Sequence, residues 1–351
     1  LLLISLTGFA GAILNSYQRF ALPALTPVML NLCLIAAALW LAPQFEEPVV
    51  ALALGVLAAG FAQLLLQVPA LAGIGLVPKP TWAPRHDGVR RIMALMVPAL
   101  FGVSVSQINL LLDTVLASLL PTGSVSWLYY SDRLTELPLG VFAIAIATVI
   151  LPTLSGQRAR ADDPAFSATL TWAIRSVLLI ALPATLALIM LAEPVLATLF
   201  QYGAFSADDR MMAAASLRAY ALGLGAFMLV KVLAPGFYAR EDMRTPVRVG
   251  IVAMVANMVL NVALVFPLMW WFNLGHVGLA LATAIAAWAN AGMLYRGLRR
   301  DAILSLSALS IRWLMQIAFA TFAMVLVILW MLPEQSLWTV WPWWQRATQL
   351  G

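Results

Sequence analysis

Long apolar stretches separated by short polar loops dominate the chain. About 20 consecutive apolar residues in a helix cross the hydrocarbon core of a bilayer, where the backbone must satisfy its own hydrogen bonds. The pattern therefore predicts an all-α polytopic membrane protein with about ten transmembrane segments. Their approximate ranges are 1–14, 26–43, 49–69, 92–120, 124–154, 169–192, 210–233, 246–267, 275–297 and 311–332.

The loops between these stretches alternate in charge, and this alternation predicts the orientation. Cytoplasmic loops of membrane proteins are enriched in Lys and Arg. We therefore expect the odd-numbered loops to be cytoplasmic and Leu1 to enter from the outer side. The basic residues of the odd-numbered loops are Arg19; Lys79, Arg85, Arg90 and Arg91; Arg158 and Arg160; Arg240, Arg244 and Arg248; and Arg296, Arg299, Arg300 and Arg312.

Composition supports the membrane class and excludes several others. Hydrophobic residues make up 63% of the chain and charged residues 10%, whereas a soluble domain is roughly half apolar and about a quarter charged. The net charge of +5 lies in short loops and does not indicate a nucleic-acid partner. Cys33 is the single cysteine, so an internal disulfide is excluded. The sequence carries no nucleotide-binding loop or hydrolase elbow, and Gly223-Leu-Gly225 inside a span indicates a packing or flexing point.

One predicted membrane helix carries charges inside it. Asp132 and Glu136 are four residues apart, and Arg133 and Glu136 are three apart, so they share a face with Tyr129 one turn earlier. Charges at membrane depth are costly and persist when they face a water-filled cavity or pair with one another. The stretch predicts a polar stripe in a substrate pathway; the alternative is an ion pair that only joins two helices.

Five polar residues on five predicted helices share one depth, the outer half of the membrane. They are Asp113, Arg133, Arg218, Asn261 and Thr283. A shared depth predicts a cavity open to one side, and the alternative is a set of separate helix–helix hydrogen bonds. Arg133 and Arg218 are suited to a phosphate, which guanidinium groups bind in a bidentate manner.

Oxygen-bearing side chains in the same region indicate a possible cation site. Asp113, Asn257, Asn261 and Thr283 offer the hard ligands that a small hard cation prefers. Asn257 and Asn261 are four residues apart and lie on one helix face. The alternative is that Asp113 pairs with an arginine.

Several motifs resemble those of the MurJ (MviN) family, the lipid II flippases of bacterial peptidoglycan synthesis. The most specific is the stretch 123–138 (GSVSWLYYSDRLTELP), followed by ILPTLS at 150–155. The others are at 103–107, 199–205 and 231–240 with Thr245-Pro246. The resemblance extends over nearly the whole chain and indicates a Gram-negative bacterial protein.

The resemblance implies a MOP-type two-lobe bundle, in which fourteen helices form two six-helix lobes and a terminal pair. The ten stretches would then be helices four to thirteen, and we expect the first three helices and the last to be missing. Residues 1–69 would end the N-terminal lobe, and 70–91 would be a cytoplasmic linker. Residues 92–297 would form the C-terminal lobe, and 298–351 a helix of the lipid-tail groove with an aromatic segment at the outer face.

The resemblance also implies roles for individual residues. Arg133 matches a cavity arginine of the family, and Glu136 matches its nearby carboxylate. Asp113, Asn257, Asn261 and Thr283 resemble the sodium site of some members, with Asn261 standing where such a site can carry a second carboxylate. The sequence predicts no cofactor, with a sodium ion as the alternative, and the departure at Asn261 weighs against sodium.

The sequence thus predicts a flippase, and not an enzyme, in the bacterial inner membrane. It would move lipid II from the cytoplasmic to the periplasmic face by alternating access. The expected substrate-binding residues are Arg133, Glu136, Asp132, Arg218 and Tyr129, and the expected hinge residues are Pro138 and Gly140. Beyond lipid II and membrane lipids, the sequence predicts no particular partner. The alternatives are another exporter of the superfamily, for O-antigen lipids or drugs, and a non-transporting scaffold of cell-wall synthesis.

Overall fold

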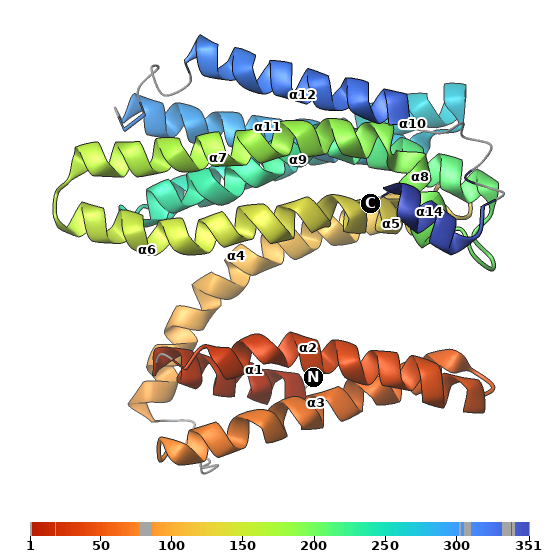
Figure 1. Cartoon of the computed structure of the whole chain (residues 1–351). Coiled ribbons are helices and arrows are strands. Elements are labelled where there is room, and N and C mark those ends of the chain that lie inside the picture. Colours follow the sequence, from red (N-terminus) through yellow and green to blue (C-terminus); the bar gives the residue numbers. More distant parts are fainter. Residues whose placement is uncertain are drawn as a thin grey trace. The chain divides into compact units, whose positions relative to one another are not determined.

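The computed structural model describes residues 2–17, 19–76, 86–301, 303–304, 310–331, 338 and 341–350. Every regular element in these ranges is a helix. The chain divides into two compact units, Leu1–Ile92 and Met93–Gly351, whose helices are drawn in Figure 1. The assignment of the predicted four parts to family lobes, linker and groove stays a prediction.

The first unit contains three helices, α1 (Leu2–Ser16), α2 (Ala21–Ala36) and α3 (Pro48–Gly73). A π-helical turn (Ala37–Leu41) and a 3₁₀ turn (Ala42–Gln44) extend α2, and α3 packs against both α1 and α2. Pro27 lies inside α2 and has no N–H for the carbonyl of Pro23. The hydroxyl of Thr26 donates to that carbonyl at 2.8 Å instead, so the helix continues through the proline.

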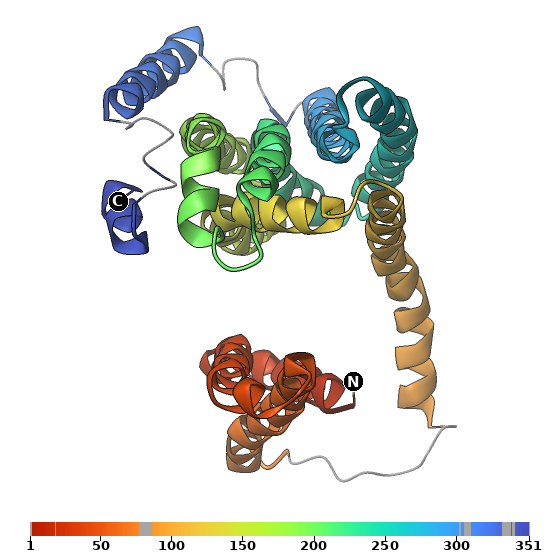
Figure 2. The same cartoon turned by 90° about the vertical axis from the view of Figure 1, so that its right-hand side faces the viewer.

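The second unit is built around one buried helix. This helix, α9, packs against α5, α7 and α11, and α10 covers the far side of α11. The helices α7, α9, α10 and α11 run side by side and are seen nearly end-on in Figure 2. The described elements after α3 are α4 (Asp87–Ser118), α5 (Ser124–Pro138), a π-helical segment (Leu139–Ile144), α6 (Ala145–Ala159), α7 (Asp163–Met190), α8 (Ala192–Leu199), α9 (Ala207–Tyr238), α10 (Arg244–Phe272), α11 (Gly275–Arg300), α12 (Ile311–Met331) and α14 (Trp343–Leu350).

Eight helices within the described residues are long and apolar enough to cross a membrane. They correspond to eight of the ten predicted stretches, and the other two, the first and the fourth, contain the shorter apolar helices Leu2–Asn15 and Asn109–Ser118. The all-α polytopic prediction is therefore confirmed. The short helix α8 was not predicted, because Glu193 and Pro194 interrupt the apolar pattern and the predicted stretch ends at residue 192.

The helix with the predicted charges changes its winding at Pro138. Pro138 cannot donate to the carbonyl of Leu134, and the chain continues as a π-helix over Leu139–Ile144 before α6 begins. Such segments are rare and occur often at functional sites. Open space surrounds Gly140, where an added Cβ would meet no atom within 4 Å. The bend expected at Pro138 and Gly140 stays a prediction, and the π-helical segment marks where it would occur.

Two glycines allow the helices of the second unit to approach closely. A Cβ at Gly223 of α9 would lie 2.8 Å from Cα of Ala284 on α11. A Cβ at Gly278 of α11 would lie 2.9 Å from backbone atoms of Val265 on α10. The interpretation of Gly223-Leu-Gly225 as a packing point is therefore confirmed.

Candidate functional site

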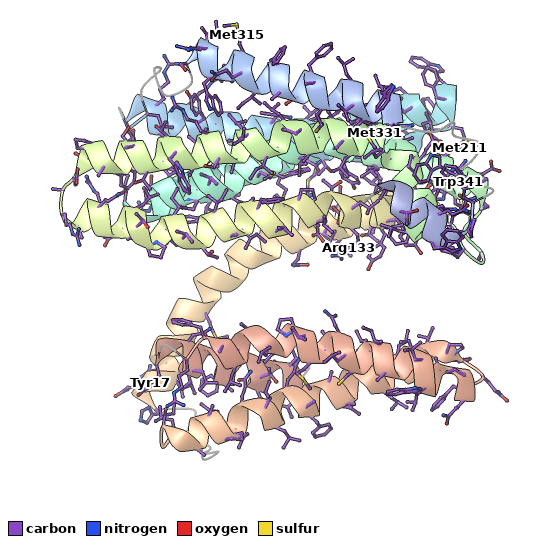
Figure 3. The ribbon with its side chains drawn as sticks, in the orientation of Figure 1. Tyr17, Arg133, Met211, Met315, Met331 and Trp341 are labelled. Atoms are coloured by element: carbon purple, nitrogen blue, oxygen red, sulfur yellow. The ribbon has the colours of Figure 1, made fainter. Side chains whose placement is uncertain are left out.

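The helix α5 has a docked face and a charged face. Ser131, Leu134, Thr135 and Pro138 are buried against the bundle. The predicted stripe of Tyr129, Asp132, Arg133 and Glu136 lies on the other side, because each residue advances about 100° around a helix. Figure 3 shows Arg133 projecting away from the body of helices α7 and α9.

Arg133 and Glu136 form an ion pair within the same helix. The Nη1 atom of Arg133 lies 2.6 Å from Oε2 of Glu136, and the two side chains are 53% and 50% exposed. The guanidinium carbon of Arg133 also lies 5.0 Å from the centre of the Tyr129 ring. The alternative prediction, in which this pair joins two helices, is therefore wrong for Arg133 and Glu136. A half-exposed pair of this kind contributes only about 0–1 kcal/mol, so it exchanges easily.

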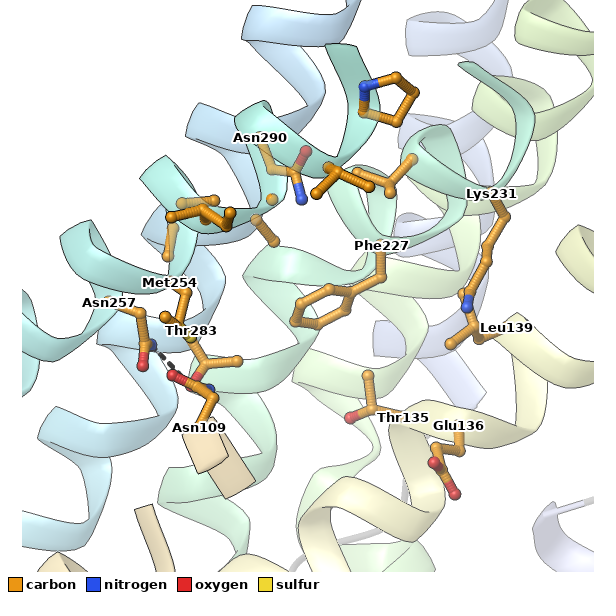
Figure 4. Close-up of a pocket in the computed structure, with 18 of the residues that line it drawn as sticks. Asn109, Thr135, Glu136, Leu139, Phe227, Lys231, Met254, Asn257, Thr283 and Asn290 are labelled. Carbon is orange, nitrogen blue, oxygen red and sulfur yellow. Dashed lines mark hydrogen bonds between the residues drawn. The ribbon is translucent and has the colours of Figure 1, made fainter. Parts of the chain in front are cut away.

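Asp132 and Glu136 line a cavity of about 560 Å³ between α5, α9, α10 and α11. The same cavity is lined by Asn109, Asn257 and Thr283. Figure 4 shows Phe227 between this amide and hydroxyl group and the side bearing Glu136. Charged and amide groups from four helices and α4 thus reach one space. Of the five residues predicted to share one cavity by their depth, only Thr283 lines it.

Further polar residues of the cavity are not among the predicted site residues. Thr135, Lys231, Tyr238 and Asn290 line it together with the acidic pair, and Figure 4 shows the amine of Lys231 directed towards Leu139. Lys231 lies inside an apolar stretch, so the rule that identified Arg133 would also have identified it. Asn290 gives a weaker signal, because one amide among many alanines indicates no direction.

The predicted oxygen ligands form a chain of hydrogen bonds. The amide nitrogen of Asn261 donates to Oδ1 of Asp113 at 2.7 Å and to Oδ1 of Asn257 at 3.2 Å. The amide of Asn257 donates to the hydroxyl of Thr283 at 3.3 Å, and the amide of Asn109 donates to Oδ2 of Asp113 at 3.2 Å. All four predicted residues therefore meet, and Asn109 joins them. The alternative pairing of Asp113 with an arginine is not found among the described residues.

This cluster has unused oxygen atoms that fit a cation. The Oδ1 atoms of Asn109 and Asn261 are buried and accept no hydrogen bond, and Asn261 is only 1% exposed. A buried carbonyl without a donor is costly, and amide and carboxylate oxygens are the ligands that a hard cation prefers. The two amide oxygens and the carboxylate of Asp113 carry one negative charge together, which suits a monovalent ion.

Arg218 lies apart from this group. Its guanidinium forms an ion pair with Glu193 at 2.9 Å and donates to the carbonyl of Ile189 at 3.2 Å. Arg218 is not among the residues that line the cavity. The structure therefore joins Arg218 of α9 to the α7–α8 corner and does not bring it beside Arg133.

Two solved structures have the same fold as this chain. The chain matches a MOP superfamily transporter from Pyrococcus furiosus with a TM-score of 0.61 at 18% identity, covering 86% of this chain and 67% of that one. It matches a structure named as lipid II flippase MurJ in an inward closed conformation with a TM-score of 0.77 at 24% identity, covering 99% and 71%. The chain therefore has the multi-pass helical fold of these two structures.

The sequence comparisons show the family. The chain belongs to the family described as lipid II flippase MurJ, whose sequence model matches residues 1–342. It is 48% identical to a probable lipid II flippase MurJ of Vibrio cholerae over 99% of this chain and 65% of the relative. It is 42% identical to the lipid II flippase MurJ of Burkholderia cenocepacia over 93% and 63%. The chain thus spans slightly less than two thirds of the length of the curated relatives it matches.

Proposed function

We propose that this chain is part of a flippase that moves lipid II from the cytoplasmic to the periplasmic face of the bacterial inner membrane. The transport would proceed by alternating access and would involve no covalent chemistry, so the protein would not be an enzyme. Family membership supports this substrate, and the curated relatives carry it in their names. The observation that carries the proposal is the exposed stripe of Tyr129, Arg133 and Glu136 at membrane depth.

In this proposal Arg133 exchanges one anion for another. Its guanidinium forms an ion pair with Glu136, and a pyrophosphate would replace that carboxylate. The resting pair is weak because both side chains are half exposed, whereas a bidentate guanidinium–phosphate pair is stronger. Glu136 would then compete with the phosphate and favour its release when the cavity opens to the outer side. Asp132 faces the cavity and would limit how deeply the anion enters.

We also propose that the cluster of Asp113, Asn257, Asn261, Thr283 and Asn109 binds sodium. Its support is the pair of buried, unpartnered carbonyl oxygens beside the Asp113 carboxylate. Sodium would then raise the unfolding temperature of the purified protein relative to potassium at equal ionic strength. Asp113→Asn should abolish the difference between the two ions. Equal unfolding temperatures of the wild type in sodium and potassium would contradict the proposal.

The flippase proposal is tested in a strain depleted of its own lipid II flippase. We would express the intact gene product and measure how much lipid II becomes accessible at the outer face. Wild type should restore accessibility and growth, and Arg133→Ala should lose both. Arg158→Ala is the matched control, because Arg158 also forms an exposed ion pair, with Asp163, and is 50% exposed.

The outcomes separate the proposal from its alternatives. Failure of a well-expressed wild type to restore lipid II accessibility would contradict the flippase and favour another exporter. Full activity of Arg133→Ala would contradict the role of Arg133. If cells grow without lipid II flipping when they express a variant that lacks all three charges of the stripe, the result would favour a scaffold.

A further inference from the structure

The predicted outer ends of three helices meet at Trp127. The indole N–H of Trp127, on the first turn of α5, donates to Oδ1 of Asp209 on α9 at 2.7 Å. The Trp127 ring also meets the ring of His276 edge-on, with centroids 4.9 Å apart. His276 lies on the first turn of α11 and is 1% exposed. Its Nε2 atom lies 3.2 Å from the carbonyl of Met212 on α9.

The two carboxylate oxygens of Asp209 have separate partners. Oδ2 accepts from the backbone N–H and the hydroxyl of Ser206, at 2.9 and 2.6 Å, and completes the capping box of α9. Oδ1 accepts the indole of Trp127. The capping box of α9 therefore explains the contacts of Oδ2 but not the hydrogen bond between Oδ1 and Trp127.

The other contacts of α5 are on the same side as Trp127. The hydroxyl of Ser131 donates to the carbonyl of Ala213 on α9 at 2.7 Å. The Tyr130 ring packs against Phe200 and Phe205, with centroids 4.6 and 5.3 Å away. Residues 127, 130, 131 and 134 follow the spacing of one helix face. This face fixes α5 to the bundle along its length.

Gly123 allows the indole to lie where it does. Gly123 has a φ of +104°, and an added Cβ would lie 2.6 Å from the Trp127 ring. Only glycine adopts this backbone conformation readily, and only glycine leaves room for the ring. The turn before α5 is thus adapted to the Trp127 contact.

The charged stripe lies opposite this docked face. Arg133 comes six residues after Trp127, which is about 9 Å along a helix and about 240° around it. A rotation of α5 about its own axis would therefore change the direction in which the side chains of Arg133 and Glu136 point. The hydrogen bond to Asp209 opposes that rotation, because it is directional and lies at the end of the helix farthest from the π-helical segment.

We propose that Trp127, held by Asp209 and His276, is a positioning residue that sets the rotation of α5 and thereby aims Arg133 at the substrate. The proposal rests on the flippase function proposed above. It assigns to Trp127 no contact with substrate. Trp127 would mainly affect the affinity for the anionic head group of the substrate. It would affect the abundance and the folding of the protein much less.

The test compares three substitutions in the intact gene product. Trp127→Phe keeps a ring against His276 and loses the hydrogen bond to Asp209. Ser206→Ala weakens the capping box and leaves Oδ1 of Asp209 to Trp127. Asp208→Ala is the charge control, since Asp208 is exposed on the same helix turn and precedes Asp209.

The unfolding temperature of each variant is measured, and two further readouts test the proposal. The first is the lipid II concentration that gives half-maximal flipping in proteoliposomes, together with the maximal rate. The second is the distance distribution between spin labels at Leu137→Cys on α5 and Leu222→Cys on α9, without other reactive cysteines. Both labelled positions are exposed, at 66% and 50%.

Trp127→Phe should raise the half-maximal concentration on the order of tenfold, because a hydrogen bond to a charged group is lost, and should broaden the distance distribution. Ser206→Ala should lower the unfolding temperature and leave the half-maximal concentration unchanged, and Asp208→Ala should change neither. Equal effects of Trp127→Phe and Ser206→Ala on both readouts would overturn the proposal, as would an unchanged distribution in Trp127→Phe. A wild type that does not flip lipid II refutes the function, and the distances still test the fixing of α5.

Discussion

The helices α9 and α11 both line the cavity, and their close packing can be tested by adding one Cβ atom at Gly223. Gly223 lies against the backbone of Ala284, and an added Cβ would approach Cα of Ala284 to 2.8 Å and its Cβ to 2.9 Å. Both neighbours are fixed by the helix, so they cannot rotate away. Gly223→Ala must therefore push α9 and α11 apart. Ala284 follows Thr283 directly, so the shift would also reach the amide cluster.

The expected cost follows from two opposing effects. Replacing glycine by alanine inside a helix normally stabilises by about 0.5–1 kcal/mol. Overpacking a close contact costs about 1–3 kcal/mol. Gly223→Ala should therefore destabilise the protein by about 1–2 kcal/mol.

Gly292→Ala is the matched control on α11. A Cβ at Gly292 would meet no atom within 4 Å, so only the favourable backbone effect remains. Thermal unfolding of the two variants in the same detergent should shift in opposite directions. If Gly223→Ala unfolds at the same temperature as Gly292→Ala, the close packing of α9 and α11 is not what the structure describes.

Three further predictions concern the ends and the middle of the helices. Hydrogen bonds from the side chain and then the backbone of Thr245 hold the pKa of Asp242 below its usual range. The carboxylate therefore stabilises α10 above the usual pKa of about 3.9, and this contribution is lost as the pH falls through the lower folded value. Asp242→Asn should flatten the dependence of the unfolding temperature on pH in this acid range. An unchanged slope would argue against a contribution of the Asp242 carboxylate. Arg218→Ala should lower stability by on the order of 1–2 kcal/mol, since it leaves the carboxylate of Glu193 unpaired, with no change in the lipid II concentration for half-maximal flipping; a raised concentration would return Arg218 to the substrate site. Pro138→Ala restores a backbone donor, so it should slow hydrogen exchange over Leu139–Ile144 and slow flipping; unchanged exchange would count against the π-helical segment.

The stripe on α5 could be predicted from sequence because its members lie on one helix. Helical spacing alone places Tyr129, Arg133 and Glu136 on a common face, and the structure has the Arg133–Glu136 contact at 2.6 Å. Spacing could not show which neighbour the opposite face would meet. The partner of Trp127 is Asp209, 82 residues further along the chain. Such a contact depends on how α5 and α9 pack, which local periodicity does not specify.

The depth of a residue in the predicted membrane does not show by itself which polar side chains come together. The direction in which each side chain points is also needed. Asp113 and Asn261 were grouped with Arg218 because all lie at a similar level of the predicted membrane. The structure joins Asp113 to Asn261 at 2.7 Å and turns Arg218 to Glu193. Depth follows from counting residues from a loop, but direction depends on which side of the helix packs against its neighbours. For a helix buried on most sides, such as α9, the sequence gives little amphipathic signal for that direction.

Lys231 shows how this limit affects a functional site. It lies on the same helix as Arg218, 13 residues further along the sequence, and it reaches the cavity that Arg218 does not. The cation that shares the cavity with Asp132 and Glu136 is therefore Lys231. A substrate head group entering there would meet two carboxylates and one amine, and pure anion binding would be opposed by the acidic pair. The cavity therefore suits a group that carries both charges, whereas Arg133, on the exposed side of α5, is the residue that we propose binds a phosphate.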